Sequence, residues 1–385
     1  MNTRPYDSTT RTMPVMQKLA EVNWNLVILI TLIACAGFAA LYSAAGGSRS
    51  PWADRQMFRF AVGLVILLGV ACVNLRVWMA LAFPAYIVSL LLLVAVEVAG
   101  RVGGLGAQRW LEFGPLALQP SELMKVALVL ALARFLHGLK PGEVSQPLKL
   151  AIPLTMIAVP VLLVLIQPNL GTAALLAMCG ALMVFLAGLS WRWIVAAVVS
   201  ICIAVPAAWQ FVLHDYQKQR VMTFFDPNSD ALGAGWNTAQ AKIALGSGGV
   251  AGKGFLHGTQ SQLSFLPEKE TDFIFTMIGE EFGFFGTLAL LGLFAMVIYY
   301  GVQVAVLSRS QFGRLLAMGI TVNFFLYIMI NGMMVMGLIP VVGIPMPLIS
   351  YGGTAMMTVM FGFGLLMSVH VHRQVDVPRH SSGII

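Results

Sequence analysis

The stretch from residue 282 to residue 306 reads FGFFGTLALLGLFAMVIYYGVQVAV and contains no charged side chain. As a helix it would be about 38 Å long, which exceeds the ~30 Å hydrocarbon core of a bilayer. The pattern extends over most of the 385 residues, of which 58% are hydrophobic and 10% charged. A soluble domain carries about 25% charged residues. The sequence therefore predicts an all-α polytopic membrane protein and excludes a soluble globular domain.

Nine further apolar stretches are bounded by charged residues or by Gly and Pro. Together with the first they predict ten transmembrane helices, near residues 23–44, 58–75, 78–99, 121–138, 151–167, 171–189, 191–212, 274–306, 315–339 and 346–369. We expect one membrane domain, 1–385, in which 1–22 and 370–385 are tails. A large loop, 213–273, separates the seventh helix from the eighth.

Lys and Arg are distributed unevenly between the two sets of helix ends. One set, which includes both tails, holds Arg4, Arg11, Lys18, Arg76, Arg134, Lys140, Lys149, Arg192, Arg309, Arg314, Arg373 and Arg379. The other set holds Arg49, Arg55, Arg59, Arg101 and Arg109. Because basic residues favour the cytoplasmic side, this count predicts that both termini are cytoplasmic and that the 213–273 loop is on the outer face. The net charge of +7 is dispersed without a basic run, so we expect no nucleic-acid partner.

Two segments on the predicted outer face have the character of ordered functional loops. Loops longer than about 15 residues are usually functional or disordered, and the 213–273 loop keeps apolar anchors such as Phe224, Phe255 and Phe265. The 100–120 segment starts with several glycines, which predicts a folded-back turn. It carries Arg109 and Trp110.

Glu122 and Lys125 are ionisable residues at the start of the fourth predicted helix. A charge at membrane depth costs at least ~2.5–3.5 kcal/mol, so such residues are functional candidates. Three positions apart on a helix, the two share a face and can pair. The pair either fixes helix packing or provides a charged lining for an outward-facing cavity.

Asp272 stands ahead of the uncharged 282–306 stretch, and Glu280 and Glu281 lie between them. A continuous helix from residue 272 to residue 306 would be about 52 Å long, so its start must protrude outward or line a cavity. Asp272 suits a helix cap and a catalytic carboxylate equally well. Glu281 would face almost opposite to Asp272, so we expect it to be a packing partner.

Glycines are concentrated between residues 246 and 254, together with Lys253, and Lys242 lies just before them. Closely spaced glycines let backbone N–H groups approach an anion, and the lysines would add positive charge for a diphosphate. A purely structural turn explains the same residues as well. His214 and His257 do not have metal-ligand spacing, so we assign them no metal.

A series of motifs follows one another along the chain. They are Arg109-Trp110, Gln119-Pro120-Ser121-Glu122, Gln167-Pro168, Leu170-Gly171-Thr172, His214-Asp215-Tyr216-Gln217, Asp226-Pro227, the glycine stretch, Leu256-His257-Gly258-Thr259-Gln260-Ser261-Gln262, Thr271-Asp272-Phe273-Ile274-Phe275 and Pro345-Met346-Pro347-Leu348-Ile349-Ser350-Tyr351-Gly352-Gly353. On these motifs the chain resembles the SEDS (shape, elongation, division and sporulation) family of bacterial cell-wall polymerases. The His257–Gln262 run resembles the elongation-type members more than the division-type FtsW.

The resemblance implies a peptidoglycan glycosyltransferase in the bacterial cytoplasmic membrane. Such an enzyme polymerises lipid II, the undecaprenyl-diphosphate-linked disaccharide pentapeptide, on the outer face. It also implies that Asp272 is essential, and an inverting displacement would use this carboxylate as general base. The substrate-binding candidates are Glu122, Lys125, Arg109, Trp110, Lys242, Lys253 and Ser350. Asn169 stands where the family commonly has Asp, so we leave it out of the catalytic set.

No cofactor is required by the sequence, although a Mg²⁺ or Mn²⁺ ion bridging the diphosphate is chemically reasonable. The resemblance implies a class B penicillin-binding protein as transpeptidase partner, and membrane lipid surrounds the helices. The alternatives are a lipid II flippase, the division-type polymerase FtsW and a non-enzymatic scaffold. A transporter would need a polar site near the midplane, whereas Asp272, Glu122 and Lys125 fall toward the outer face.

Overall fold

The computed structural model describes residues 13–102, 108–113, 116–140, 142–211, 218, 222, 224, 234–262 and 268–377. His214 and Phe265 lie outside these ranges. Ten helices of 17 residues or more occur in the described part: α2 (Trp24–Ala44), α3 (Ala53–Cys72), α4 (Leu75–Ala99), α5 (Pro120–His137), α6 (Pro147–Ile166), α7 (Leu170–Leu186), α8 (Trp191–Phe211), α12 (Ile274–Leu307), α13 (Gln311–Val335) and α14 (Gly353–Val371).

Each long helix overlaps one of the predicted apolar stretches. Seven of them, α2, α3, α4, α6, α12, α13 and α14, are long and apolar enough by themselves to cross a bilayer. The helix α7 and the first part of α8 are apolar but shorter. The prediction of a mostly helical membrane protein is therefore confirmed.

The helix α5 lies in the middle of the bundle, where it packs against α4, α13 and α7. All but three of its residues are buried, including Glu122 and Lys125. A helix that is enclosed by other helices does not face lipid, so it tolerates charges that neighbouring side chains neutralise. This explains why the helix that carries the buried ion pair is less apolar than those around it.

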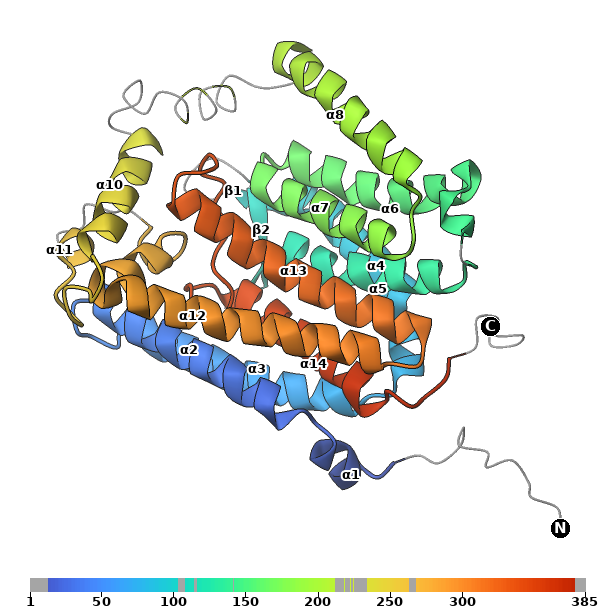
Figure 1. Cartoon of the computed structure of the whole chain (residues 1–385), viewed down its shortest axis with the longest axis horizontal. Helices are drawn as coiled ribbons and strands as arrows, with labels where there is room; N and C mark the ends of the chain where they lie inside the picture. Colours follow the sequence, from blue (N-terminus) through green and yellow to red (C-terminus); the bar gives the residue numbers. More distant parts are fainter. Residues whose placement is uncertain are drawn as a thin grey trace.

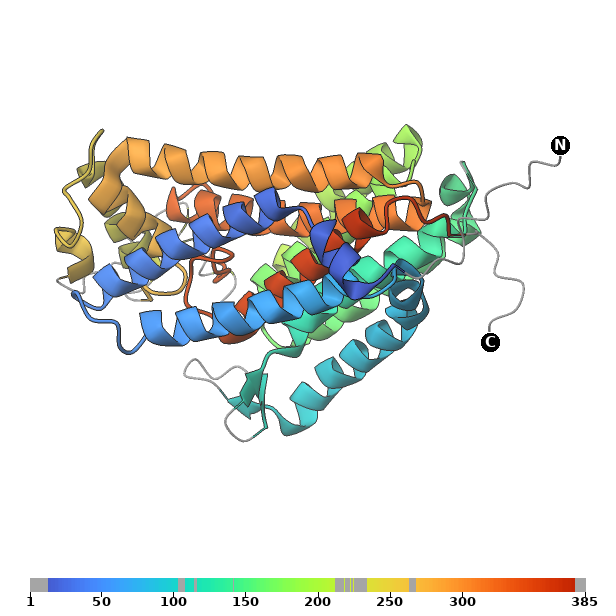
Figure 2. The ribbon, with the colours of Figure 1, turned by 90° about the horizontal axis from the view of Figure 1, so that it is seen from below.

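Short helices lie outside the long ones at opposite ends of the bundle (Figures 1 and 2). The short helix α1 (Val15–Ala20) lies at one end, where Lys18 Nζ donates to the Cys72 carbonyl at 2.7 Å. At the same end Arg373 pairs with Glu21 at 3.1 Å. The helices α10 (Ala234–Ser247) and α11 (Thr259–Gln262) lie at the opposite end.

The predicted folded-back turn in the 100–120 segment is a small antiparallel sheet. Its strands are β1 (Arg101–Val102), β2 (Gln108–Phe113) and β3 (Leu116–Leu118), in the order β1-β2-β3. Leu111 is paired with Leu118, and the sheet leads directly into α5. Between β3 and α5 only Gln119 intervenes, so the sheet fixes the position at which α5 begins.

The tenth helix begins later than predicted, at Gly353 instead of residue 346, and the ninth ends at Val335 instead of residue 339. The connection between them, 336–352, contains Pro340, Pro345 and Pro347. Proline lacks the N–H that a helix interior requires and restricts the residue before it to extended conformations. We call residues 336–352 the α13–α14 loop.

The helix α12 is broken at Gly283, whose backbone (φ 64°, ψ −158°) is far from helical. The break releases carbonyl and N–H groups that a continuous helix would pair internally. A segment of the preceding loop takes them up: Lys253 and Gly254 donate their N–H groups to the Glu280 and Glu281 carbonyls, both at 3.0 Å. A single continuous helix from residue 272 to residue 306 is therefore not what forms.

Candidate active site

Asp272 lies in the turn of residues 268–273, immediately before α12. Its N–H donates to the Glu268 carbonyl at 3.2 Å, and its side chain is partly exposed. Gly343 of the α13–α14 loop comes close to the carboxylate: a Cβ atom placed on this glycine would lie 3.3 Å from Asp272 Oδ2. With φ at +68°, Gly343 has a conformation that favours glycine. The loop can therefore pass directly beside the carboxylate.

Asn331 of α13 fixes the Asp272 turn against the α13–α14 loop. Its side-chain Nδ2 donates to the Asp272 carbonyl at 2.9 Å and to the Ile344 carbonyl at 2.8 Å. The residue is fully buried, so both bonds form away from water. One amide group thus sets the position of the carboxylate-bearing turn relative to the loop that covers it.

One helical turn before Asn331, Tyr327 closes a cluster with Glu122 and Lys125. Lys125 Nζ lies 2.6 Å from Glu122 Oε1, and the Tyr327 hydroxyl donates to Glu122 Oε2 at 2.6 Å. Lys125 also donates to the Tyr327 hydroxyl and lies 4.2 Å from the centre of its ring. The cluster joins α5 to α13, on the helix that also carries Asn331.

The burial of this cluster bears on the two alternatives left open for Glu122 and Lys125. The Lys125 and Glu122 side chains are only 2% and 4% exposed, and Tyr327 is buried with them. Within the described residues the pair is enclosed, which is compatible with the packing alternative. A role of Glu122 and Lys125 in substrate binding stays a prediction.

The glycine stretch packs against the break in α12. Phe284 donates its N–H to the Gly249 carbonyl at 2.9 Å, in addition to the bonds from Lys253 and Gly254. A Cβ on Gly252 would lie only 2.1 Å from the Glu281 carbonyl oxygen, so a side chain does not fit there. The N–H groups of Gly249 and Gly252 bond within the stretch itself. These N–H groups are engaged within the protein, and an anion-binding role of this stretch stays a prediction.

Lys253 and Glu280 form a second ion pair, 2.7 Å between Nζ and Oε1. Glu280 is fully buried, whereas the Lys253 side chain is 26% exposed. The carboxylate also accepts from the Gln260 N–H at 3.0 Å and from Thr259 Oγ1 at 3.2 Å. Glu281 is buried too and accepts a hydrogen bond from Ser43 of α2, as expected for a packing partner.

Arg109 and Trp110 lie on β2 and are partly exposed. Arg109 Nε donates to the Gln167 carbonyl at 3.4 Å, and its Nη2 donates to the Pro168 carbonyl. Gln167 in turn donates to the Leu93 carbonyl at 2.9 Å. The arginine therefore ties the small sheet to the α6–α7 turn, and part of its guanidinium is already used.

A profile of the FtsW, RodA and SpoVE cell cycle proteins matches residues 18–375. The chain belongs to this family. It is 46% identical to the peptidoglycan glycosyltransferase MrdB of Escherichia coli K12 over 357 residues, which cover 92% of this chain and 95% of that protein. An FtsW of Trichlorobacter lovleyi is 33% identical and covers 91% of this chain and 94% of its own length.

Two solved structures have the same fold as this family member. One, described as a peptidoglycan synthase complex that coordinates polymerization and crosslinking, gives a TM-score of 0.80 at 32% identity. It covers 91% of this chain and 98% of its own. The rod shape determining protein RodA of Thermus thermophilus gives a TM-score of 0.70 at 29% identity, covering 92% and 98%. The resemblance to the SEDS family is thus confirmed.

The departure from the family at Asn169 has a structural use. Asn169 is the N-cap of α7, and its side-chain oxygen accepts from the Thr172 N–H at 3.3 Å. Asn and Asp are equally good N-caps, so the amide serves this position as well as a carboxylate would. That Asn169 takes no part in catalysis stays a prediction.

Ser350 and Lys242 are placed in different environments. Ser350 is buried, its Oγ accepts from the Met346 N–H at 2.8 Å, and its carbonyl accepts from Gln56 Nε2 at 2.9 Å. These bonds give Ser350 a role in holding the α13–α14 loop. Lys242 is exposed on α10. Their contact with substrate stays a prediction.

Sequence reasoning missed Tyr327 and Asn331, which are neutral. A search for polar side chains four positions apart within the apolar 315–335 stretch would have found both.

Within the described residues no three His, Cys, Asp or Glu side chains converge on a point that could hold a metal ion.

Proposed function

We propose that this family member is a peptidoglycan glycosyltransferase of cell elongation, which polymerises lipid II into β-1,4-linked glycan strands on the outer face of the cytoplasmic membrane. The observation that carries the proposal is the 46% identity to MrdB over nearly the whole chain. The lower identity to FtsW favours the elongation function over the division function. A flippase would share the fold but not the named activity of this relative.

In this proposal all ten long helices cross the membrane and both termini are cytoplasmic. Glu21 precedes the first long helix and Arg373 follows the last one, so their ion pair supports a location of both termini on the same side of the membrane. The α10 and α11 helices and the Asp272 turn then belong to the outer face, within the loop between the seventh and eighth helices.

Single cysteines at Lys242 and Lys140, in a chain whose four native cysteines are replaced, would test the topology. We expect a membrane-impermeant maleimide to label position 242 from outside and to label position 140 only after lysis.

The reaction we propose is a single displacement at the anomeric carbon. The 4-hydroxyl oxygen of the acceptor sugar bonds to this carbon while the bond to the diphosphate oxygen breaks, which converts an α-linkage into a β-linkage. Asp272 accepts the hydroxyl proton, and undecaprenyl diphosphate leaves. The partly exposed carboxylate beside Gly343 and the buried Asn331 bonds to its turn support this role. Preset orientation of a base is worth several orders of magnitude in rate.

The departing diphosphate needs positive charge. Arg109, Lys242 and Lys253 are the candidates that keep some exposure, with Trp110 beside Arg109. Lys125 and Glu122 would act indirectly, since they hold Tyr327 on the helix that also carries Asn331. Neutralising the developing charge in a water-poor site contributes several kcal/mol.

The test of the function is polymerisation of lipid II by the purified protein. We expect wild type to make glycan strands and Asp272→Asn to be at least ~100-fold slower, because a general base contributes 10²–10⁴-fold. Asp376→Asn, an exposed carboxylate at the other end of the bundle, is the matched control and should retain full activity. Lipid transport without polymer from wild type would replace the proposal by the flippase. Normal polymer from a folded Asp272→Asn variant would remove Asp272 from the base role.

A class B penicillin-binding protein is the partner we propose. The solved peptidoglycan synthase complex to which this chain is similar supports an assembly of this kind. Co-expression and purification through a tag on the penicillin-binding protein should recover the chain in stoichiometric amount and raise its polymerisation rate. Recovery without the chain, or no change of rate, would contradict the partnership.

A further inference from the structure

A cavity of about 440 Å³ lies at the same end of the bundle as Asp272, and neither the predicted site nor the proposed mechanism uses it. It is lined by Ala44, Ala45, Gly46, Ser50, Pro51, Trp52 and Lys269. The first six residues belong to the end of α2 and its connection to α3, and Lys269 belongs to the turn before α12. Its volume lies in the range of small-molecule sites, which is about 300–1,000 Å³.

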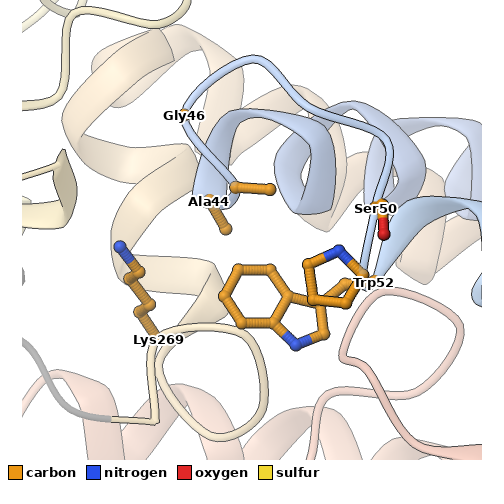
Figure 3. Close-up of a pocket in the computed structure, with 7 residues that line it drawn as sticks. Ala44, Gly46, Ser50, Trp52 and Lys269 are labelled. Carbon is orange, nitrogen blue, oxygen red and sulfur yellow. The ribbon is translucent and has the colours of Figure 1, made fainter.

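The lining combines one aromatic plane with a few polar groups. Figure 3 shows the Trp52 indole between the Lys269 side chain on one side and Ser50 on the other. Ala44, Ala45 and Gly46 offer only small surfaces, so a ligand can approach the indole closely. A flat apolar surface beside a hydroxyl and an ammonium group suits a pyranose ring, which has apolar C–H faces and polar edges. An acyl chain would use neither Ser50 nor Lys269.

The presence of Lys269 in the lining indicates that this sugar carries an anionic group. Partial burial lowers the pKa of Lys269, and the nearby Glu270 opposes this effect. An ammonium group that is partly withdrawn from water interacts more strongly with an anion than a fully solvated one does. The cavity therefore favours a saccharide that carries a carboxylate or phosphate over a neutral one.

The cavity and Asp272 share one structural unit. Lys269 is three residues before Asp272 in the 268–273 turn, whose Glu270 carbonyl accepts the Tyr351 N–H at 2.8 Å. Trp52 directly precedes α3, and Gln56 of the first turn of α3 donates to the Ser350 carbonyl. The α2–α3 connection and the turn are thus both attached to the α13–α14 loop, so a ligand in the cavity lies next to the catalytic turn.

We propose that this cavity is a saccharide subsite, in which a sugar ring of the substrate packs on Trp52 while Lys269 and Ser50 bind its anionic and hydroxyl groups. The inference rests on the proposed function, which supplies a sugar ligand with anionic substituents. The sugar comes either from lipid II or from the growing glycan strand, and the two sources share this chemistry.

The test compares Trp52→Ala and Lys269→Gln with wild type in polymerisation of purified lipid II. If the cavity holds lipid II, we expect the KM for lipid II to rise about tenfold for Trp52→Ala and about threefold for Lys269→Gln, with kcat nearly unchanged. If it holds the growing strand, the first coupling stays normal and the strands become several-fold shorter. Trp52→Phe and Lys269→Arg keep the aromatic plane and the charge, and they should recover most of either loss.

Two competitors separate the saccharide from the rest of the substrate. The water-soluble disaccharide pentapeptide should inhibit wild type and lose about tenfold in potency against Trp52→Ala. Undecaprenyl diphosphate, which has no sugar, should inhibit both equally. The matched controls are Trp24→Ala and Lys140→Gln, which change exposed side chains outside the cavity.

The proposal is overturned if a folded Trp52→Ala variant has wild-type KM, kcat and strand length, or if Trp52→Phe behaves like Trp52→Ala. A melting curve in detergent establishes that each variant is folded. An inactive wild-type protein would instead overturn the proposed function, so the two failures are distinguishable.

Discussion

Among the residues that the structure describes, two ion pairs have a buried carboxylate, and the two pairs differ in their contact with water. Lys125 and Glu122 are both enclosed, at 2% and 4% exposure, and connect two central helices through Tyr327. Lys253 and Glu280 are 26% and 0% exposed and connect a glycine-rich loop to the break in α12. The first pair is part of the bundle interior, whereas the second attaches the glycine-rich loop to a helix that is not continuous.

This difference shows how one protein uses the same chemistry for two purposes. An enclosed pair is costly to break, because removal of one partner leaves a charge without water or a counter-ion. In the second pair, Glu280 keeps two further donors and Lys253 already reaches solvent. We infer that the first pair sets the positions of α5 and α13 permanently, and that the second can open without disrupting the bundle.

Removal of Lys125 should have the largest effect. Lys125→Met leaves the Glu122 carboxylate buried with only the Tyr327 hydroxyl as partner, which should cost about 3–5 kcal/mol of stability. The measurement is thermal or denaturant unfolding in detergent.

The double variant Lys125→Met, Glu122→Gln is the control for this prediction, because it removes both charges. It should recover most of the lost stability. If the double variant folds normally but makes no polymer, the pair acts on substrate and not only in packing. Equal stability of Lys125→Met and wild type would contradict the enclosed position of the pair.

Asn331→Leu is expected to have the next largest effect, and it tests whether the buried interior positions the turn that carries the proposed base, Asp272. The variant leaves the Asp272 and Ile344 carbonyls without their donor, at a cost of about 2–4 kcal/mol. We expect kcat to fall about 10–100-fold with little change of KM, because a displaced base reacts more slowly while substrate still binds. Steady-state kinetics with lipid II measure both constants.

Asn323→Leu provides a matched control on the same helix. Asn323 is buried, but its side-chain oxygen has no hydrogen-bond partner in the described part of the chain. Its replacement should change activity less than twofold. A similar loss in both variants would show that α13 tolerates no change of polarity, and the positioning role of Asn331 would be abandoned.

Lys253→Met tests the more open pair and should cost less, about 1–2 kcal/mol, since Glu280 retains the Gln260 and Thr259 donors. The same unfolding measurement as for Lys125 gives a direct comparison. A loss of stability as large as that of Lys125→Met would mean that the glycine-rich loop is held as firmly as the bundle interior.

Much of the fold could be predicted from the sequence, because the rule that governs it is local. An apolar run of about 20 residues must be helical to satisfy its backbone in lipid, so hydropathy located the long helices. The break at Gly283 was not foreseen, because its backbone groups are satisfied by the distant loop residues 249–254. The late start of α14 has a local cause, three prolines within an apolar stretch, which the hydropathy pattern does not register.

The site was less predictable for a related reason. Charge at membrane depth identified Glu122 and Lys125, and a family motif identified Asp272. Neither signal shows that Tyr327 and Asn331 connect them. A neutral polar residue in an apolar helix costs little free energy in the membrane, so it does not stand out in the sequence as a charge does. Trp52 and Lys269 meet only because the α2–α3 connection folds beside a turn more than 200 residues later in the chain.

A third, more exposed ion pair extends the comparison, and its removal should have the smallest effect of these substitutions. Lys149 and Glu143 lie 2.8 Å apart with side chains 37% and 26% exposed. The hydrogen bond from Lys149 lowers the pKa of Glu143, with a further contribution from the Lys140 N–H. The pair therefore contributes to the stability of the fold above the ordinary carboxyl pKa of 4.5, and this contribution is lost as pH falls through the lower folded-state pKa.

We expect Lys149→Gln to melt within measurement error of wild type at pH 7, and any small difference to vanish when the melts are repeated in acid. A clear loss of stability at pH 7 would show that exposure does not rank these pairs, and the distinction between the enclosed and the open pair would then need another cause.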